Sequence, residues 1–240
     1  MDDVKKLFAD LLLQKGLHVS DTQWNQFEAY YRELVSWNEK MNLTGITERE
    51  QVYIKHFYDS LSLSFFVPMS GIATIADIGS GAGFPSIPLK IMFPHLRVTI
   101  VDSLNKRIQF LNHLVQTLGL EHVDCLHGRA EDLARNVSLR DSFDLVTARA
   151  VARLNVLNEF CLPFVKSAGL FAAMKGADPE EELQEAALSL KVLRGQVKSV
   201  VRFELPVEQS ARHMIIVKKT GTTPAKYPRK AGLPLKQPLV

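Results

Sequence analysis

Cysteine is scarce in this chain of 240 residues, which contains only Cys125 and Cys161. Two cysteines so far apart provide neither a disulfide framework nor the spacing of a zinc site, which favours a reducing, cytoplasmic compartment. The chain also lacks a basic and then apolar leader, so we do not expect export. Its longest uncharged run, residues 60–76, is interrupted by Pro68 and Gly71 and predicts no membrane span.

Acidic residues are absent from the C-terminal stretch, residues 218–240, although the whole chain has a net charge of only +3. Four prolines interrupt the same stretch, so we expect it to build no core of its own. We interpret it as a basic arm for a polyanion, with a merely solubilising tail as the alternative. Its basic residues are Lys218, Lys219, Lys226, Arg229, Lys230 and Lys236.

The most informative stretch is residues 74–93, where an apolar run is followed by Gly79, Gly81 and Gly83 and then by a helical pattern. Glycine adopts positive φ and lets a ligand lie against bare backbone. The spacing differs from the G-x-G-x-x-G of dinucleotide sites. Preceded by Asp77 and Ile78, it is typical of the first motif of methyltransferases that use S-adenosylmethionine (SAM). The alternative is a tight turn between a strand and a helix.

Two acidic residues follow later strands of the same pattern. Asp102 ends the strand predicted at 97–101, about 20 residues after the glycines, where an acid accepts hydrogen bonds from ribose hydroxyls. A solvated loop aspartate is the alternative. Glu131 follows the strand predicted at 123–126 and is interpreted as an acceptor for ribose or adenine, with the Ala130 backbone at the ring. Its alternative role is to stabilise a helix start.

Two arginines, Arg149 and Arg153, follow the strand predicted at 143–148, at the edge where open α/β sheets bind ligands. They either position a substrate or form structural ion pairs. His56 and Asp59 are spaced as neighbours on one helix face, either as an acid/base pair or as a structural contact. The polar side chains of Asn38, Asn42 and Thr44 either contact substrate or fix a turn.

The order of strands and helices predicts the fold class. Strands alternate with helices from residue 72 to 195, which indicates an α/β fold with a mostly parallel sheet and helices on both faces. Residues 197–205 and 213–217 alternate as a final antiparallel pair. We therefore predict a helical cap at 1–70, a methyltransferase domain at 71–217 and a basic, proline-rich tail at 218–240. Ser20 with Gln23, and Thr47 with Glu50, predict two helix-capping boxes in the cap.

Along nearly its whole length the chain resembles the bacterial small-subunit rRNA guanine-N7 methyltransferases, the RsmG or GidB (glucose-inhibited division protein B) family. One departure is Ser86, where many members have glycine, and it falls at a helix start. The matching segments are Trp37-Asn38, Asn42-Leu43-Thr44, His56 with Asp59-Ser60, Asp77–Pro85, Asp102-Ser103, Arg129–Glu131, Thr147–Val151 and Lys226–Lys230.

The resemblance implies a class I SAM-methyltransferase fold and methyl transfer to N7 of one guanine in the decoding-region loop of 16S rRNA. The implied partner is the small ribosomal subunit, and we expect a monomer. In the family, loss of the enzyme is associated with low-level streptomycin resistance. The expected cofactor site is Gly79, Phe84, Ala130, Glu131 and Arg149 from the resemblance, with Gly81 and Asp102 added from the patterns above.

Guanine N7 carries a lone pair and no proton, so this reaction needs no catalytic base. We expect Arg149 and Arg153 to hold the target nucleotide or a neighbouring phosphate. RNA is usually read at unstacked bases, so we expect the guanine to flip onto Phe84 or Tyr58. Two rival interpretations are a SAM methyltransferase with a protein or small-molecule acceptor and a non-catalytic RNA-binding assembly factor.

Overall fold

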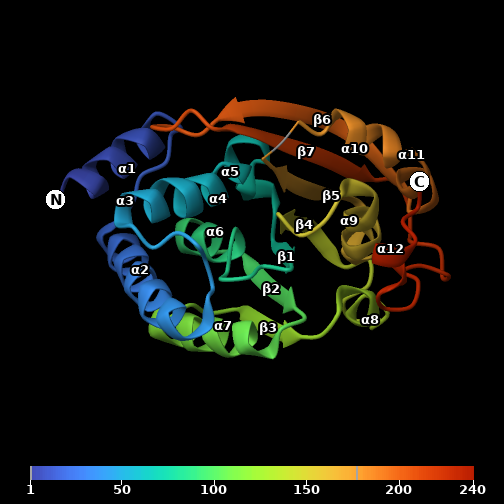
Figure 1. Cartoon of the computed structure of the whole chain (residues 1–240), viewed down its shortest axis with the longest axis horizontal. Helices are drawn as coiled ribbons and strands as arrows, with labels where there is room; N and C mark the ends of the chain where they lie inside the picture. The colour runs from blue at the N-terminus through green and yellow to red at the C-terminus, as the bar shows by residue number, and fades with distance from the viewer. Residues whose placement is uncertain (1, 177) are drawn as a thin grey trace.

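The computed structural model describes residues 2–176 and 178–240, which form a seven-stranded sheet with helices on both faces (Figure 1). The strand order is β3-β2-β1-β4-β5-β7-β6, and β7 runs antiparallel to both of its neighbours. The strands are β1 (Thr74–Ile78), β2 (Arg97–Asp102), β3 (Val123–His127), β4 (Phe143–Arg149), β5 (Val165–Lys175), β6 (Gly195–Glu204) and β7 (Ala211–Lys219).

Helices precede the sheet and connect its strands. Before it lie α1 (Asp3–Leu13), α2 (Asp21–Met41), α3 (Arg49–Val52), the π-helical η1 (Tyr53–Tyr58), α4 (Asp59–Leu61), α5 (Leu63–Phe66) and the 3-10 turn η2 (Met69–Gly71). The others are α6 (Ser86–Met92), α7 (Asn105–Thr117), α8 (Ala130–Leu133), α9 (Leu154–Cys161), the 3-10 turn η3 (Leu162–Phe164), α10 (Glu180–Glu185), α11 (Ala187–Val192) and α12 (Leu233–Lys236).

One of the two predicted capping boxes is present. Ser20 Oγ accepts from the Gln23 N–H, and the Gln23 side chain accepts from the Ser20 N–H, which confirms the start of α2. The second box is wrong. Glu48, not Thr47, caps α3, because its two carboxylate oxygens accept from two consecutive backbone N–H groups of the first turn.

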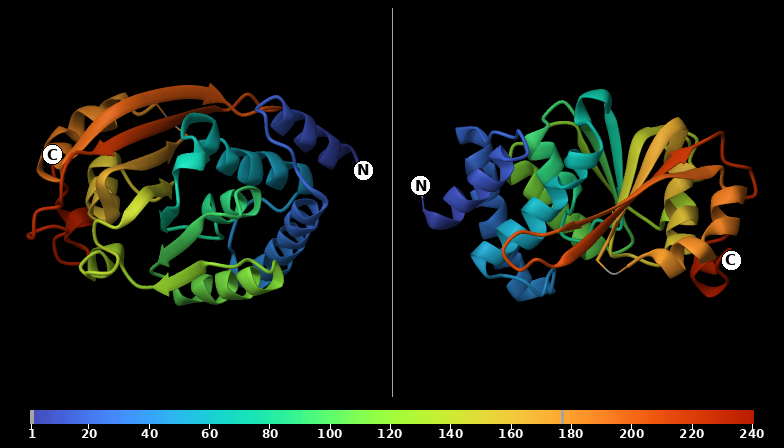
Figure 2. Two further views of the ribbon diagram at one scale, coloured as in Figure 1. Left: turned by 180° about the vertical axis from the view of Figure 1, so that it is seen from behind. Right: turned by 90° about the horizontal axis from the view of Figure 1, so that it is seen from above.

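Both faces of the central strands β1 and β4 are buried, so these strands are apolar on both sides. Adjacent residues of β1 face opposite cores, with Ile75 in the core under α2, α6 and α7, and Ala76 in the core under α9 and α11. Figure 2, seen from above, shows these helix layers on opposite sides of the sheet. The predicted α/β fold with a mostly parallel sheet is confirmed.

The first 70 residues do not form a core of their own. Phe8, Phe27 and Phe57 pack in the same apolar cluster as Ile75 and Ile87 of β1 and α6. The predicted boundary at 70 therefore stays a prediction, and Met1 of that range lies outside the described residues. β7 extends to Lys219, two residues beyond the other predicted boundary.

The C-terminal stretch is folded onto the body of the protein, and its interpretation as a basic arm for a polyanion stays a prediction. Lys219 is fully buried, and its Nζ donates to Asp141 Oδ1 at 2.9 Å and to Thr223 Oγ1 at 2.7 Å. Arg229 pairs with the buried Glu159 of α9. Composition alone did not predict this docking, because it does not show that Lys219 and Arg229 pair with Asp141 and Glu159 of other segments. Four lysines of the stretch remain exposed: Lys218, Lys226, Lys230 and Lys236.

Strand order fixes where a ligand can bind. β1 lies between β2 and β4. From β1 the chain adds β2 and β3 on one side of the sheet and then β4 and β5 on the other, so the strand order reverses at β1. Ligands of open α/β sheets bind at such a switch point, outside the carboxyl ends of the strands. Among the described residues, the structure has no helix with the length and apolar character that crossing a membrane requires.

Candidate active site

The glycine loop after β1 needs its glycines for two reasons. Gly79, Gly81 and Gly83 have φ of +73°, +63° and +100°, a region that other residues avoid. A Cβ on Gly79 would lie 2.8 Å from Val151 Cγ2, and one on Gly83 would lie 2.8 Å from the Tyr30 hydroxyl. The loop is therefore pressed between a helix of the N-terminal part and the segment that follows β4.

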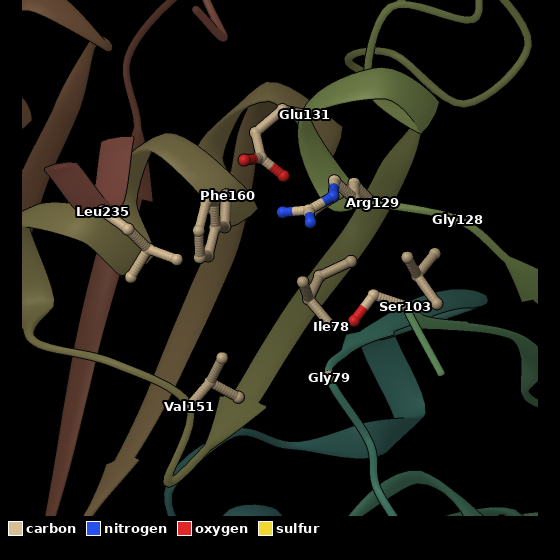
Figure 3. A pocket seen from close by; sticks show the side chains of 11 residues that line it. Ile78, Gly79, Ser103, Gly128, Arg129, Glu131, Val151, Phe160 and Leu235 are labelled. Atoms are coloured by element: carbon tan, nitrogen blue, oxygen red, sulfur yellow. The ribbon is translucent and has the colours of Figure 1, made fainter. Parts of the chain in front are cut away.

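A cavity of about 170 Å³ lies beside this loop (Figure 3). In Figure 3 the Phe160 and Leu235 side chains form one wall, and Arg129 and Glu131 reach into the space from another. We call it the glycine-loop cavity. Its lining residues are Ile78, Gly79, Val101, Ser103, Gly128, Arg129, Ala130, Glu131, Val151, Phe160 and Leu235.

The lining of this cavity is mostly apolar, with a carboxylate at its edge. Val151 and Leu235 are 38% and 56% exposed, which is unusual for such side chains beside a cavity and suits an apolar ligand surface. Glu131 is 3% exposed, and its Oε1 accepts from the Gly232 N–H at 2.8 Å. These features fit an adenosine-like group, which has a flat apolar base and ribose donors.

Of the seven predicted cofactor residues, three line this cavity, and the other four, Gly81, Phe84, Asp102 and Arg149, do not. Gly79, Ala130 and Glu131 line it. Asp102 is 2% exposed, and its carboxylate accepts from the Gly81 and Leu104 N–H groups at 3.1 and 2.9 Å. In this structure Asp102 therefore braces the glycine loop, and its expected role toward ribose stays a prediction.

Phe84 also supports the site from behind. Its ring lies 5.4 Å from the Tyr30 ring and 4.6 Å from the His56 ring, and the Arg149 guanidinium carbon is 4.9 Å from its centroid. Phe84 and Tyr58 are both buried. Neither ring therefore offers a free face, and the geometry gives no support to the expectation that one of them stacks on a target base.

A second cavity, of about 340 Å³, lies at the carboxyl ends of β4 and β5, and we call it the Arg149 cavity. Arg149 Nη1 lies 3.0 Å from Asp59 Oδ2, and Arg212 Nε lies 3.4 Å from Asp59 Oδ1. Two arginines thus share the single Asp59 carboxylate, which leaves a net positive charge that suits a phosphate-bearing ligand. The lining residues are Ile46, Lys55, His56, Asp59, Arg149, Ala150, Met174, Lys175, Gly176 and Arg212.

His56 is a neutral, structural member of this cavity. Burial, reinforced by the nearby Arg149 charge, lowers the pKa of His56 to about 3. Its Nε2 is hydrogen-bonded to Thr44 Oγ1 at 2.8 Å, and the Thr44 N–H donates to Asn38 Oδ1 at 2.8 Å. The structural alternatives for Asn38 and Thr44 are therefore the ones observed. Asp59 bonds Arg149 rather than His56, so the two do not form an acid/base pair.

Arg153 is not part of either cavity in the described structure. Its guanidinium lies 3.0 Å from both Glu181 and Glu185 of α10, and its side chain is 49% exposed. Glu181 in the first turn of α10 and Glu185 at its end pair with this charge, so the geometry gives no support to the expectation that Arg153 positions substrate, which stays a prediction. The ion-pair alternative is the one observed.

Three consecutive residues separate the two cavities. Arg149 and Ala150 line the Arg149 cavity, and Val151 lines the glycine-loop cavity. Ala150 has a φ of +54°, which turns the chain sharply at the end of β4. The two cavities therefore adjoin along residues 149–151.

Several lining residues were not singled out from the sequence. Phe160 and Leu235 enter the glycine-loop cavity from α9 and α12, and Arg212 enters the Arg149 cavity from β7. The apolar Leu233-Pro-Leu235 run inside a basic stretch was a signal that this stretch packs against something. Arg212 gave no signal, since nothing in a single sequence distinguishes it from other strand arginines.

The sheet order and the glycine loop at its switch point define the fold of class I SAM-dependent methyltransferases. A solved O-methyltransferase from Bacillus cereus in complex with SAH shares this fold with a TM-score of 0.56 and 14% identity, covering 80% of this chain and 90% of that one. Residues 23–215 match the GidB family model, rRNA small subunit methyltransferase G, and the chain belongs to this family.

Close relatives extend the match to nearly the full chain. The ribosomal RNA small subunit methyltransferase G of Bacillus velezensis is 56% identical over 232 residues, 97% of each chain. That of Brevibacillus brevis is 55% identical over 236 residues, 98% of this chain and 99% of the relative. The resemblance drawn from the motifs is confirmed.

Proposed function

We propose that this protein transfers a methyl group from SAM to N7 of a guanine in the decoding-region loop of 16S rRNA. The observation that carries the proposal is the pair of adjoining cavities at the switch point, separated by residues 149–151. One has the apolar walls and carboxylate that adenosine requires, and the other has the cations that a nucleotide requires. The names of the relatives support small-subunit rRNA as the acceptor.

The glycine-loop cavity would hold the cofactor through a few of its residues. Gly79 and Ala130 would contact it through backbone, Glu131 would accept from a donor of its adenosine part, and Phe160 and Leu235 would cover its base. When bound, SAM supplies a methyl group already activated by a sulfonium. Val151 lies over Gly79, so this side chain is the one that we expect to move when a ligand extends along the loop.

The Arg149 cavity would hold the target nucleotide. Guanine N7 has a lone pair and no proton, so no side chain has to remove one. The low pKa of His56, about 3 because of burial, makes it a weak base, which agrees with a reaction in which no proton has to be removed. The contribution of these residues is positioning, which is worth up to about 7–11 kcal/mol in the best oriented systems. Arg149, fixed by Asp59, is the residue that we assign to it.

Methyl transfer from labelled SAM tests this function. The acceptors are undermethylated small ribosomal subunits and protein-free small-subunit RNA, each digested to nucleosides afterwards. We expect to recover the label as 7-methylguanosine. We further propose that the protein acts as a monomer in the cytoplasm. Measurable SAM binding without labelled RNA would favour a protein or small-molecule acceptor. An absence of SAM binding would favour the assembly-factor interpretation.

A further inference from the structure

We infer that residues 229–235 of the C-terminal stretch are a working part of the cofactor site, with Leu235 as a wall for the adenine and Gly232 as the partner that orients Glu131. The inference rests on the proposed function in one respect, because it takes the ligand of the glycine-loop cavity to be an adenosine compound. Otherwise it depends on contacts of the C-terminal stretch itself, which lies over α9 and beside α8 in Figure 1.

Glu131 joins this stretch to the cavity. Its Oε1 accepts from the Gly232 N–H at 2.8 Å, a contact across 101 residues of sequence. Gly232 has a φ of +82°, a conformation that glycine tolerates and that directs its N–H toward α8. A carboxylate has two oxygens, and a neutral N–H on one of them leaves the other available to a ligand. Docking of the stretch thus fixes the rotamer of the expected ribose or adenine acceptor.

A buried ion pair holds the stretch in this position. Arg229 Nη2 lies 2.7 Å from Glu159 Oε2, Arg229 Nε lies 2.9 Å from Oε1, and the Arg229 backbone N–H donates to Oε1 at 2.7 Å. Glu159 is fully buried, so removing Arg229 would leave an unpaired buried charge. The next residue of α9, Phe160, lines the cavity, and the anchor therefore lies beside the cavity wall.

Leu235 presents an apolar surface to the cavity that the protein itself does not cover. It is 56% exposed and stands beside Phe160 in Figure 3, facing the space into which Glu131 points. Covering such a surface with a flat base removes apolar area from water and favours binding. The basic stretch therefore has two kinds of residues: those whose contacts complete the cofactor site, and four exposed lysines whose side chains make none of these contacts.

The test is calorimetric binding of SAM and of the unreactive product S-adenosylhomocysteine to the full chain and its variants. Leu235→Ala should weaken both by about fivefold or more, because part of a leucine contact is lost. The matched control is Leu13→Ala, a leucine of α1 that is 53% exposed and lies outside the cavity. It should bind both compounds like the wild type.

A second measurement does not depend on any variant folding. In the wild-type protein, S-adenosylhomocysteine should slow hydrogen exchange of the amides of residues 229–235. Unchanged exchange there, or equal affinities for Leu235→Ala and wild type, would overturn the inference while leaving the proposed function standing. Failure of the wild-type protein to bind either compound would overturn both.

Discussion

Asp77, at the end of β1, is the single side chain most at odds with its surroundings. It is fully buried, and its carboxylate accepts from the Ser86 N–H at 3.1 Å, which ties the two ends of the glycine loop together. Burial raises the pKa of Asp77 from its ordinary 3.8 to about 6, although hydrogen bonds to the charged form oppose this. The loop is therefore held by a group that destabilises the folded protein at neutral pH.

Replacing this carboxylate should make the protein more stable at high pH. Because its folded pKa is raised, the stability that Asp77 contributes is present below about pH 4 and is lost as the pH rises through about 6. Asp77→Asn keeps an acceptor for Ser86 and should raise the free energy of unfolding by about 1–3 kcal/mol at pH 8. Urea unfolding at pH 4 and pH 8 measures it, with the exposed Asp10→Asn as control. An equal change at both pH values would contradict this account.

Arg149 at the end of β4 and Arg153 shortly after it provide a matched pair for the reaction itself. Arg149→Ala should lower the methyl-transfer rate by about 100-fold, since small losses of positioning have effects of this size. Arg153→Ala should react like the wild type, because its partners are Glu181 and Glu185 on the surface. Single-turnover transfer to undermethylated subunits measures both. Equal losses of rate in the two variants would indicate that Arg153 also positions the substrate.

At the scale of residues, the sequence correctly predicted cavity-lining residues that come directly after the ends of strands. Gly79, Ala130 and Glu131 line the cavity because each follows a parallel strand, and such ends meet at one edge. Leu235 and Arg212 could not be predicted, because they arrive from segments whose placement depends on tertiary packing.

At the scale of elements, the end of β7 is fixed by a buried amine. Lys219 Nζ donates to Asp141, Thr223 and the carbonyls of Leu162 and Val165, while burial lowers the pKa of this lysine. The preceding residue of the strand, Lys218, is exposed. Alternation on a strand puts the two side chains on opposite faces, one in the core and one in water.

This alternation predicts very different effects for the same substitution. Lys219→Met should lower the free energy of unfolding by about 2–4 kcal/mol, because the carbonyls of Leu162 and Val165 lose their buried donor. Lys218→Met should change it by less than about 0.5 kcal/mol. Chemical denaturation of both variants measures the difference. A small effect of Lys219→Met would mean that the tail after β7 is held by other contacts.

Elements were predicted well where periodicity is long and poorly where it is short. The alternation of β6 and β7 and the capping box of α2 gave the correct elements. The helical stretch from Arg49 to Phe66 was not predicted in detail, because the apolar pattern of a single sequence does not show whether a backbone N–H bonds to the carbonyl four or five residues earlier.

At the scale of the whole molecule, the C-terminal stretch has a structural role, and we propose an electrostatic role toward RNA in addition. Its four exposed lysines lie outside the anchored contacts and remain available to RNA phosphates. Composition predicted the charge of this stretch correctly. It could not predict docking, because proline-rich segments have no periodicity and their position is decided by the surface of α9.

Neutralising these lysines should separate the two roles. Glutamine at Lys218, Lys226, Lys230 and Lys236 should weaken RNA binding most at low salt and reduce the slope of log affinity against log salt by up to about 3. Affinity for S-adenosylhomocysteine should not change, since Arg229, Gly232 and Leu235 are intact. Filter binding across a salt series measures the slope. An unchanged slope would exclude these lysines from RNA contact.

The most direct test of the central claim is to map the modified atom on the RNA. Undermethylated small subunits are incubated with the protein and SAM, and the extracted 16S rRNA is cleaved chemically at 7-methylguanosine. We predict one new cleavage site in the decoding-region loop, strong with the wild type and much reduced with Arg149→Ala. No new cleavage, or cleavage scattered over many guanines, would contradict the assignment of this protein as a site-specific guanine-N7 methyltransferase.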